Sequence, residues 1–510
     1  AYLSFEENRS VRNYGAAFAL YVLAMLSKTT AVTLPATLLV LLWWRQGRLQ
    51  WHRHLRPLLP WLLVGGALGL FVSWVERKYL GAEGGAFALT FGQRILVAGR
   101  ALWFYAAKDL WPSPLVFFYP KWRPDPGAPG QWLFPLGLAV LAIVLWSLRR
   151  RTRLPLAVLL CFAGVLFPVL GFFNFYGSLY SFVADHWQYL ALPVIIGTAA
   201  SGVAFAPKWF SRGKGRMVAV LGVVLPAPLG LLTWQQCAIY RNDDTLYRST
   251  LAANPGCWMA YNNLGEELME AGRFAEAAGE FQRSVQLEGG YFESHYNLGN
   301  ALAHLGRWPE AAAAYKDALS IRPGNSTIHD NLAIVLSRMG REEDALAEYE
   351  TAVSLDSGNK QAHNNLGNQL LRMGRLAEAV DQYEQALRID PGYPDAHNNL
   401  ADAEVKRGRL SEALDEYQKA VTLKPDFAEA QNNLGNTLVR MGRPDEAIGH
   451  YQAALRLNPR DAQIHLNFGI ALAGLPGRLP EAIEEVETAV RLKPDDPKAR
   501  EVLSRLQAAQ

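Results

Sequence analysis

Two hydrophobic patterns divide the chain near residue 240. The earlier part contains seven apolar runs of 13 to 21 residues, and several approach the roughly 20 residues that a helix needs to cross a bilayer. The later part has apolar residues three or four positions apart among polar ones, which is typical of amphipathic helices. The sequence therefore predicts an all-α protein with a polytopic membrane domain over 1–240. The apolar runs lie at 14–26, 30–44, 58–75, 132–148, 154–173, 186–206 and 217–235.

A second regularity organises residues 258–496, where one pattern occurs seven times with a period of 34 residues. A small residue follows each key apolar residue and allows two helices to approach closely. A Gly-Arg pair eight or nine residues later permits a sharp turn between helices. The key apolar residues are Leu264, Leu298, Leu332, Leu366, Leu400, Leu434 and Phe468.

This period and these residue types resemble those of the tetratricopeptide repeat (TPR) family, whose repeats are pairs of helices. One such pair cannot bury its apolar face alone, so neighbouring repeats stack into an α-solenoid. We predict seven repeats over 258–496, a linker with a capping helix over 241–257, and a second capping helix over 497–510.

Charge separates the same two parts of the chain. Residues 241–510 contain 28 Lys/Arg and 40 Asp/Glu, which leaves 22 basic and 7 acidic residues for 1–240. Thirteen of the 15 tryptophans also lie in 1–240. A basic, tryptophan-rich and apolar part is typical of an integral membrane protein. We expect membrane lipid and no nucleic acid as its partner, because the basic residues form short clusters between apolar runs.

Three basic clusters without acidic residues predict the orientation, since loops rich in Lys and Arg stay in the cytoplasm. All three are cytoplasmic only if 76–131 is one extracytoplasmic loop, in which 94–111 lies along the membrane surface. The first two apolar runs then form two tilted spans with a tight outer turn at Lys28, and one long kinked segment is the alternative. We therefore expect a multi-pass protein of a bacterial inner (plasma) membrane with its TPR array on the periplasmic (extracytoplasmic) side. The clusters lie within 45–56, 149–153 and 208–216.

Three stretches of the membrane part carry a resemblance of their own. They are LSKTTAVTLPATLLVLLWWRQGRL (26–49), the segment 74–122 that begins with WVERKYLGAEGGAFAL, and YSFVADHWQYLALP (180–193). Together with the TPR array they resemble the transmembrane-and-TPR proteins, which are GT-C-type glycosyltransferases. The resemblance implies a mannosyltransferase-like enzyme that uses a polyprenyl-phosphate-linked sugar as donor and Ser/Thr hydroxyls of proteins as acceptors. It implies no certain cofactor, and the need for a divalent metal stays open.

The same resemblance indicates where an active site would lie. In GT-C enzymes the key acid is in the first extracytoplasmic loop, and the opening residues here look like the middle of a later loop. We therefore expect the membrane domain to be N-terminally incomplete and to lack that catalytic loop. No metal-ligand pattern is present in the sequence. Candidate supporting residues near the donor phosphate are Asp185, His186 and Tyr189, where a helix cap formed by the first two is the alternative.

Five basic residues in the predicted outer segments are candidates for binding the donor phosphate or lipid headgroups. The alternative for each is that its charged end simply extends to the membrane surface. These residues are Lys28, Arg77, Lys78, Lys121 and Arg123.

Every repeat has an asparagine directly before its key apolar residue. In TPR proteins this position faces the concave surface, and O-GlcNAc transferase has a similar asparagine ladder in its TPR superhelix. A row of carboxamides can hydrogen bond to both the N–H and the C=O groups of an extended peptide. Alternatively, asparagine is simply common at this position of TPR repeats and has no binding role. The ladder asparagines are Asn263, Asn297, Asn331, Asn365, Asn399, Asn433 and Asn467.

Two hypotheses for function follow from these patterns. The first is a membrane glycosyltransferase whose external TPR array binds the acceptor or a partner peptide. The second is a non-catalytic, membrane-anchored TPR scaffold that assembles protein complexes of the cell envelope.

Overall fold

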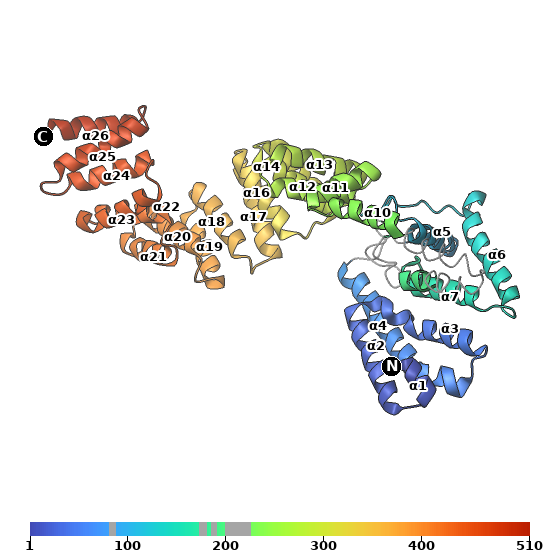
Figure 1. Ribbon diagram of the computed structural model, residues 1–510. Helices are drawn as coiled ribbons and strands as arrows, with labels where there is room; N and C mark the ends of the chain where they lie inside the picture. Colours follow the sequence, from blue (N-terminus) through green and yellow to red (C-terminus); the bar gives the residue numbers. More distant parts are fainter. Residues whose placement is uncertain (81–87, 173–180, 185–190, 199–225, 510) are drawn as a thin grey trace. The chain divides into compact units, whose positions relative to one another are not determined.

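The computed structural model describes residues 1–80, 88–172, 181–184, 191–198 and 226–509 (Figure 1). Every regular element in these ranges is helical, and they contain no strand. They group into two compact units, Ala1–Ala271 and Gly272–Gln510, and each is described below by itself. The predicted all-α fold is confirmed for these residues.

The N-terminal unit begins with four helices that pack around a buried tryptophan. Trp61 is 1% exposed, and the rings of Tyr2 and Tyr21 lie against it. The hydroxyls of Tyr14 and Tyr21 donate hydrogen bonds to the carbonyls of Pro57 and Trp61, respectively. The start of the chain is thus a helix rather than the predicted loop, because Tyr2 packs into this core. The elements are α1 (Tyr2–Asn8), α2 (Val11–Ser27), η1 (Thr29–Thr33), α3 (Leu34–Gln46), the π-helical turn η2 (Trp51–Leu55) and α4 (Arg56–Leu80).

A second core forms around α5, the helix predicted to lie along the membrane surface. Helix α5 is buried from Leu96 to Ala101 except at Arg100, which is exposed. The Arg100 guanidinium lies 4.4 Å from the centre of the Trp122 ring. This turn of the helix therefore packs on protein, and the Arg100 cation lies over an aromatic ring. The elements of this region are α5 (Phe91–Leu110), η4 (Pro129–Trp132), α6 (Leu133–Leu148), α7 (Leu154–Leu166), η5 (Phe167–Val169) and α10 (Pro226–Ile239).

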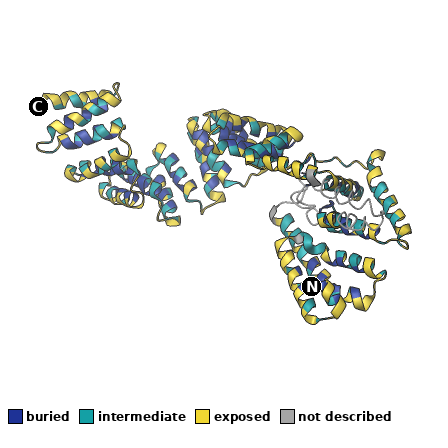
Figure 2. Ribbon diagram, viewed as in Figure 1, coloured by how far each residue is buried: buried dark blue, intermediate teal, exposed yellow. Residues whose placement is uncertain are grey.

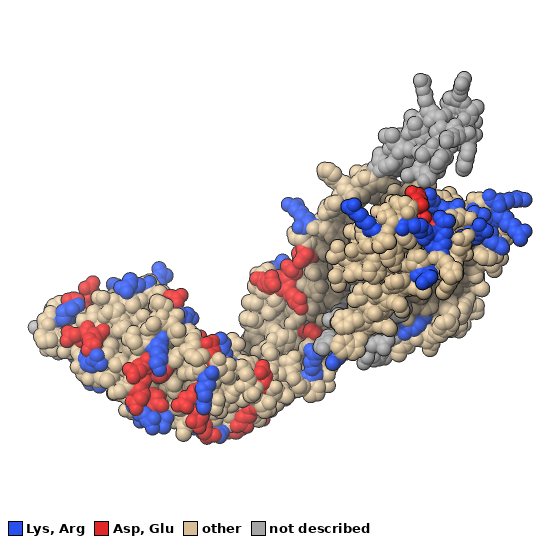
Figure 3. Space-filling model, turned by 90° about the horizontal axis from the view of Figure 1, so that it is seen from below, with Lys and Arg blue, Asp and Glu red and all other residues tan. Residues whose placement is uncertain are grey.

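Two helical segments among the described residues are long and apolar enough to cross a membrane, Trp51–Glu76 and Pro129–Leu148. No residue of α6 is buried, and Figure 2 shows it in the colours of exposed and intermediate side chains. Figure 3 shows a broad uncharged area on the N-terminal unit, whereas acidic and basic side chains alternate along the C-terminal unit. By contrast, α2 and α3 have only 17 and 13 residues, fewer than a full crossing needs. Of the predicted runs 186–206 and 217–235, only 191–198 and 226–235 lie within the described residues.

The contacts of α3 and α7 bring two of the predicted basic loops together. A β-carbon at Gly47, just after α3, would lie 2.4 Å from the guanidinium of Arg153, just before α7. At the opposite ends of these two helices η1 packs against η5. Beyond η5, the Gly171 carbonyl accepts a 2.7 Å hydrogen bond from Arg94 of α5. Two basic loops thus share one end of the helices, and α5 begins at the other end. The third basic cluster, 208–216, lies outside the described residues.

The loop after α5 contacts the start of the repeat region within the same unit. The Leu115 carbonyl accepts a hydrogen bond from the Gln236 side chain, and the Phe118 carbonyl accepts one from Asn254. The Phe118 ring packs against the buried core around Cys257. This loop therefore lies on the same side of the unit as the helices that lead into the repeats. These helices are α10, α11 (Asp243–Ala253) and α12 (Trp258–Glu270).

The C-terminal unit is a succession of short antiparallel helices in which each packs on the next. The turn glycine after each first helix has φ between 70° and 79°, a conformation that favours glycine, so the predicted Gly-Arg turns are confirmed. The helices are α13 (Phe274–Leu287), α14 (Phe292–His304), α15 (Trp308–Ile321), α16 (Ser326–Arg338), α17 (Glu342–Leu355), α18 (Lys360–Arg372), α19 (Leu376–Ile389), α20 (Pro394–Lys406), α21 (Leu410–Leu423), α22 (Ala428–Arg440), α23 (Pro444–Leu457), α24 (Ala462–Ala473), α25 (Leu479–Leu492) and α26 (Pro497–Ala508).

The small residue after each key apolar residue has the predicted role. A β-carbon at Gly367 would lie 2.5 Å from the ring of Tyr383, a buried residue of the second helix of its repeat. The same distance separates a β-carbon at Gly299 from Tyr315. The repeats thus depend on close packing of a helix backbone against a buried aromatic ring.

Candidate functional site

The first helices of four central repeats share a stripe of polar side chains, which we call the ladder face. It consists of the ladder asparagine and the residues three and seven positions later, which lie on one side because seven residues make almost two helical turns. All seven ladder asparagines are intermediate between buried and exposed. The ladder face comprises Asn331, Ile334 and Arg338 in α16, Asn365, Asn368 and Arg372 in α18, Asn399, Asp402 and Lys406 in α20, and Asn433, Asn436 and Arg440 in α22.

Most ladder amides donate a hydrogen bond to the preceding helix pair. The Asn365 Nδ2 lies 3.1 Å from a carboxylate oxygen of Asp330, and the Asn399 Nδ2 lies 2.9 Å from the Asn364 carbonyl oxygen. The sequence predicted that these side chains face solvent, and their role in joining repeats is a further finding. The other described donations run from Asn263 to Tyr247, from Asn331 to Tyr296 and Asn300, from Asn433 to Asp402, and from Asn467 to Asn432.

On the ladder face, the carbonyl oxygens of two ladder asparagines remain available. Within the residues that the structure describes, the Oδ1 atoms of Asn331 and Asn365 accept no hydrogen bond. Each amide therefore uses its donor inside the protein and keeps an acceptor for another molecule.

Tyrosine hydroxyls of the second helices hold the middle row of the ladder face. Tyr383 is fully buried, and its hydroxyl donates a 2.7 Å hydrogen bond to Asn368 of the ladder face. Tyr349 has Ile334 opposite it, so this pairing is missing in its repeat. The equivalent bonds are Tyr315 to Asn300, Tyr417 to Asp402, and Tyr451 to Asn436.

Two acids lie among these amides. Burial raises the pKa of Asp330, although the hydrogen bond from Asn365 opposes the rise. Burial also raises the pKa of Asp402, against the hydrogen bond from Tyr417 and the nearby Lys406 charge. Both shifts disfavour the charged carboxylate on the ladder face.

The basic candidates of the membrane part do not form one described cluster. Lys28 is exposed between α2 and η1, whereas Lys78 lies near the end of α4 with its ammonium 5.0 Å from the Trp74 ring centre. Lys121 and Arg123 are exposed in the loop after α5, and the Lys121 ammonium lies 5.5 Å from the Phe182 ring centre.

Four remaining candidates carry no structural account. The backbone at Arg77 belongs to α4, and its side chain lies outside the described part of the molecule. Asp185, His186 and Tyr189 also lie outside the described residues.

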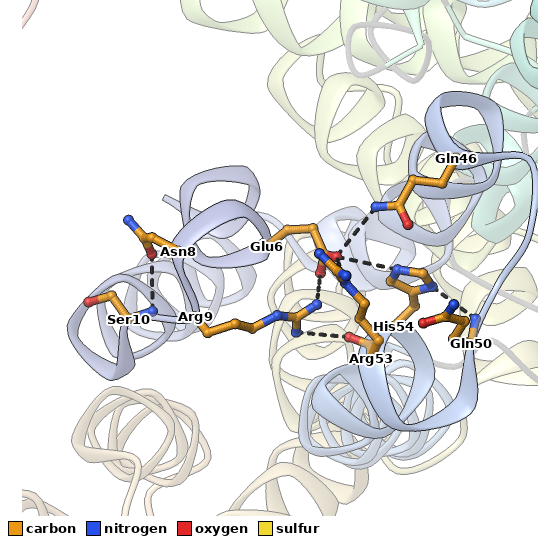
Figure 4. Close-up of polar contacts among 8 residues, drawn as sticks. All are labelled: Glu6, Asn8, Arg9, Ser10, Gln46, Gln50, Arg53 and His54. Carbon is orange, nitrogen blue, oxygen red and sulfur yellow. Dashed lines mark hydrogen bonds and ion pairs between the residues drawn. The ribbon is translucent and has the colours of Figure 1, made fainter.

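A buried polar network at the start of the chain was not predicted (Figure 4). Glu6 of α1 is 3% exposed, and its carboxylate lies 2.7 Å from Arg9 and 2.8 Å from Arg53. It also lies 3.3 Å from the fully buried His54, whose Nδ1 accepts a hydrogen bond from the Gln50 N–H. Only the helical spacing of Glu6 from Arg9 could have indicated this pairing. The network fastens α1 to η2.

Sequence profiles described as "TPR repeat" match residues 367–403 and 401–442. Others described as "Tetratricopeptide repeat" match 245–291, 263–326, 302–368 and 432–497. No protein with curated annotation matches the chain.

Several solved structures are similar to the repeat region. YrrB, "a TPR protein with an unusual peptide-binding site", is 29% identical over 38% of this chain and 98% of its own, with a TM-score of 0.32. A tetratricopeptide repeat protein from Parabacteroides merdae is 17% identical over 49% of this chain and 98% of its own, with a TM-score of 0.41. Pseudomonas aeruginosa PilF is 22% identical over 43% and 97%, with a TM-score of 0.39. From residue 245 to residue 497, the chain is an array of TPR repeats.

Proposed function

We propose that this chain is a membrane-anchored scaffold whose TPR array binds an extended peptide segment of a partner protein along the ladder face. The observation that carries the proposal is the repeated carboxamide, half-buried at one position of successive stacked helices. TPR repeats are protein-binding modules, which agrees with this use of the array.

The chemistry of the ladder suits a peptide backbone. The free Oδ1 atoms of Asn331 and Asn365 can accept hydrogen bonds from backbone N–H groups of a peptide. Their Nδ2 atoms are already engaged by the preceding repeat, so their carboxamide planes are fixed before binding. Such preorganisation lowers the entropy cost of forming the complex.

The proposal places the array outside the cytoplasm. The first two basic loops meet at one end of α3 and α7, and basic loops favour the cytoplasmic side. The loop after α5 and the helices leading into the repeats contact each other. If 76–131 is extracytoplasmic, this contact supports an extracytoplasmic position for the start of the array as well. The exposed apolar helix α6 supports an anchor in the membrane.

A triple variant tests binding by the ladder. The detergent-solubilised full chain is used to select extended peptides from a displayed library, and their affinities are then compared with the variant Asn331→Ala/Asn365→Ala/Asn399→Ala. We expect each amide to contribute about 0.5–1.5 kcal/mol, so the triple variant should lose about tenfold or more in affinity.

The matched control removes three exposed carboxamides that occupy one position of the second helices, Gln282, Gln418 and Gln452. This control should bind like the parent. A ladder variant that is helical by circular dichroism and still binds as tightly as the parent would refute the proposal.

The glycosyltransferase hypothesis remains a prediction. Its supporting residues Asp185, His186 and Tyr189 lie outside the described residues, so no observation of the site favours it over the scaffold.

A further inference from the structure

Four consecutive repeats end their first helix with an exposed cation on the ladder face. Arg338, Arg372, Lys406 and Arg440 are separated by the repeat period of 34 residues, and each lies seven positions after a ladder asparagine. The carboxamides and the cations therefore form two parallel rows on the same side of α16, α18, α20 and α22.

The cations of this row differ from the other arginines of the array in their partners. At six of the seven interhelix turns the arginine has an acid within 2.6 Å, three residues later. Within the described residues, by contrast, Arg338, Lys406 and Arg440 form no ion pair. Arg372 donates to Ser337 and Gln369 and lies 4.0 Å from Glu342. A favourable interaction with the helix C-terminus explains why a cation occupies the last turn of a helix. It does not explain why three of these cations have no ion pair in an array that contains more acidic than basic residues.

The cations of the row lie close enough to the ladder face to influence its tyrosine hydroxyls. Burial raises the pKa of Tyr349, and Arg372 and Arg338 both oppose that rise through their charge. Arg440 acts on the Tyr417 hydroxyl in the same way. The Lys406 charge acts on Asp402, which is already bonded to Tyr417 and Asn433.

We propose that the partner segment bound on the ladder face is an acidic peptide whose carboxylates contact Arg338, Arg372, Lys406 and Arg440. This inference rests on the proposed function and adds the class of peptide. Helices packed side by side are about 8–10 Å apart, and α16, α18 and α20 contact one another in succession. A polyproline II peptide advances about 9.3 Å over three residues. Acidic residues at every third position would therefore meet one cation per repeat.

The test compares two peptides of identical composition on the full chain in detergent. One carries Glu at four positions spaced by three residues, and the other carries the same four Glu residues consecutively. We expect the spaced peptide to bind about tenfold more tightly at low salt, and its affinity to fall as salt rises. A spaced peptide with Gln in place of Glu should bind weakly and with little salt dependence.

Two triple variants with equal loss of charge identify the cations involved. Arg338→Gln/Lys406→Gln/Arg440→Gln should remove most of the preference for the spaced acidic peptide. Arg307→Gln/Arg375→Gln/Arg443→Gln removes three paired turn arginines and should retain the preference. If both triples behave alike while the asparagine variant abolishes binding, the acidic class is wrong and the ladder function stands. If neither the Glu nor the Gln peptide binds the parent, the ladder function fails as well.

Discussion

The hydroxyl bonds of the repeat tyrosines allow a stability prediction with an internal control. Tyr383→Phe removes the 2.7 Å hydrogen bond to Asn368 but leaves the fully buried ring in place. The lost bond is neutral, and Asn368 is half-buried and can be rehydrated, so we expect a cost of about 1 kcal/mol. Tyr349→Phe should cost less than about 0.5 kcal/mol, because Ile334 offers no acceptor to the hydroxyl.

Urea unfolding of residues 241–510, followed by circular dichroism, measures both variants. The midpoint should shift at constant slope, since neither change alters the area exposed on unfolding. Ile334→Asn then creates the missing acceptor, so Tyr349→Phe in that background should cost about 1 kcal/mol. Equal costs for Tyr349→Phe and Tyr383→Phe in the parent background would refute the assignment of this energy to the pairing with the ladder face.

Three further predictions concern other parts of the chain. Asp402→Asn keeps an acceptor for Tyr417 and removes a carboxylate whose pKa is raised by burial, so the variant should be more stable than the parent at pH 7. This stability advantage should shrink in acid, because the Asp402 carboxylate of the parent becomes protonated as pH falls through its raised pKa and no longer carries a buried charge. Urea unfolding at pH 7 and pH 4 measures the difference, and an equal difference at both pH values would contradict the prediction. Glu6→Gln should lower the stability of the full chain to heat in detergent by about 1–2 kcal/mol, a moderate loss because the arginine partners of Glu6 are partly exposed to solvent. Glu7→Gln is the control and should change the stability little, because Glu7 forms an exposed ion pair. A reporter fused after Gln510 should be active only in the periplasm, and activity in the cytoplasm would overturn the proposed orientation.

The repeat region could be predicted from the sequence because its constraints are local and recur. Gly299, Gly367 and Gly435 each meet a tyrosine ring from the same repeat, so one spacing encodes one contact. The turn glycines have a positive φ that few other residues adopt without strain. The bonds between ladder amides and the preceding repeat were not predicted, because the partner at that position changes from Tyr296 to Asp330 and Asn364.

The N-terminal unit was predicted less completely because its key contacts join distant residues. Glu6 meets Arg53 across 47 positions, and no periodic pattern links them. Hydropathy indicated apolar runs but not helix lengths, and the first two are divided by the short η1 turn into helices shorter than a full crossing. The burial of α5 against protein was not predicted, since its amphipathic pattern fits a membrane surface and a protein core equally well.

The two functions of a ladder asparagine are physically coupled. The amide group of Asn365 holds Asp330 of the preceding repeat, and its carbonyl oxygen is the group proposed to bind a peptide. A hydrogen bond accepted at Oδ1 polarises the carboxamide and strengthens donation from Nδ2. Peptide binding would therefore tighten the contacts between successive repeats, and stiffer contacts would in turn hold the next carboxamide in place. An array of this kind should bind a long segment more favourably than the sum of its short pieces, which is the behaviour that a scaffold for extended partners requires.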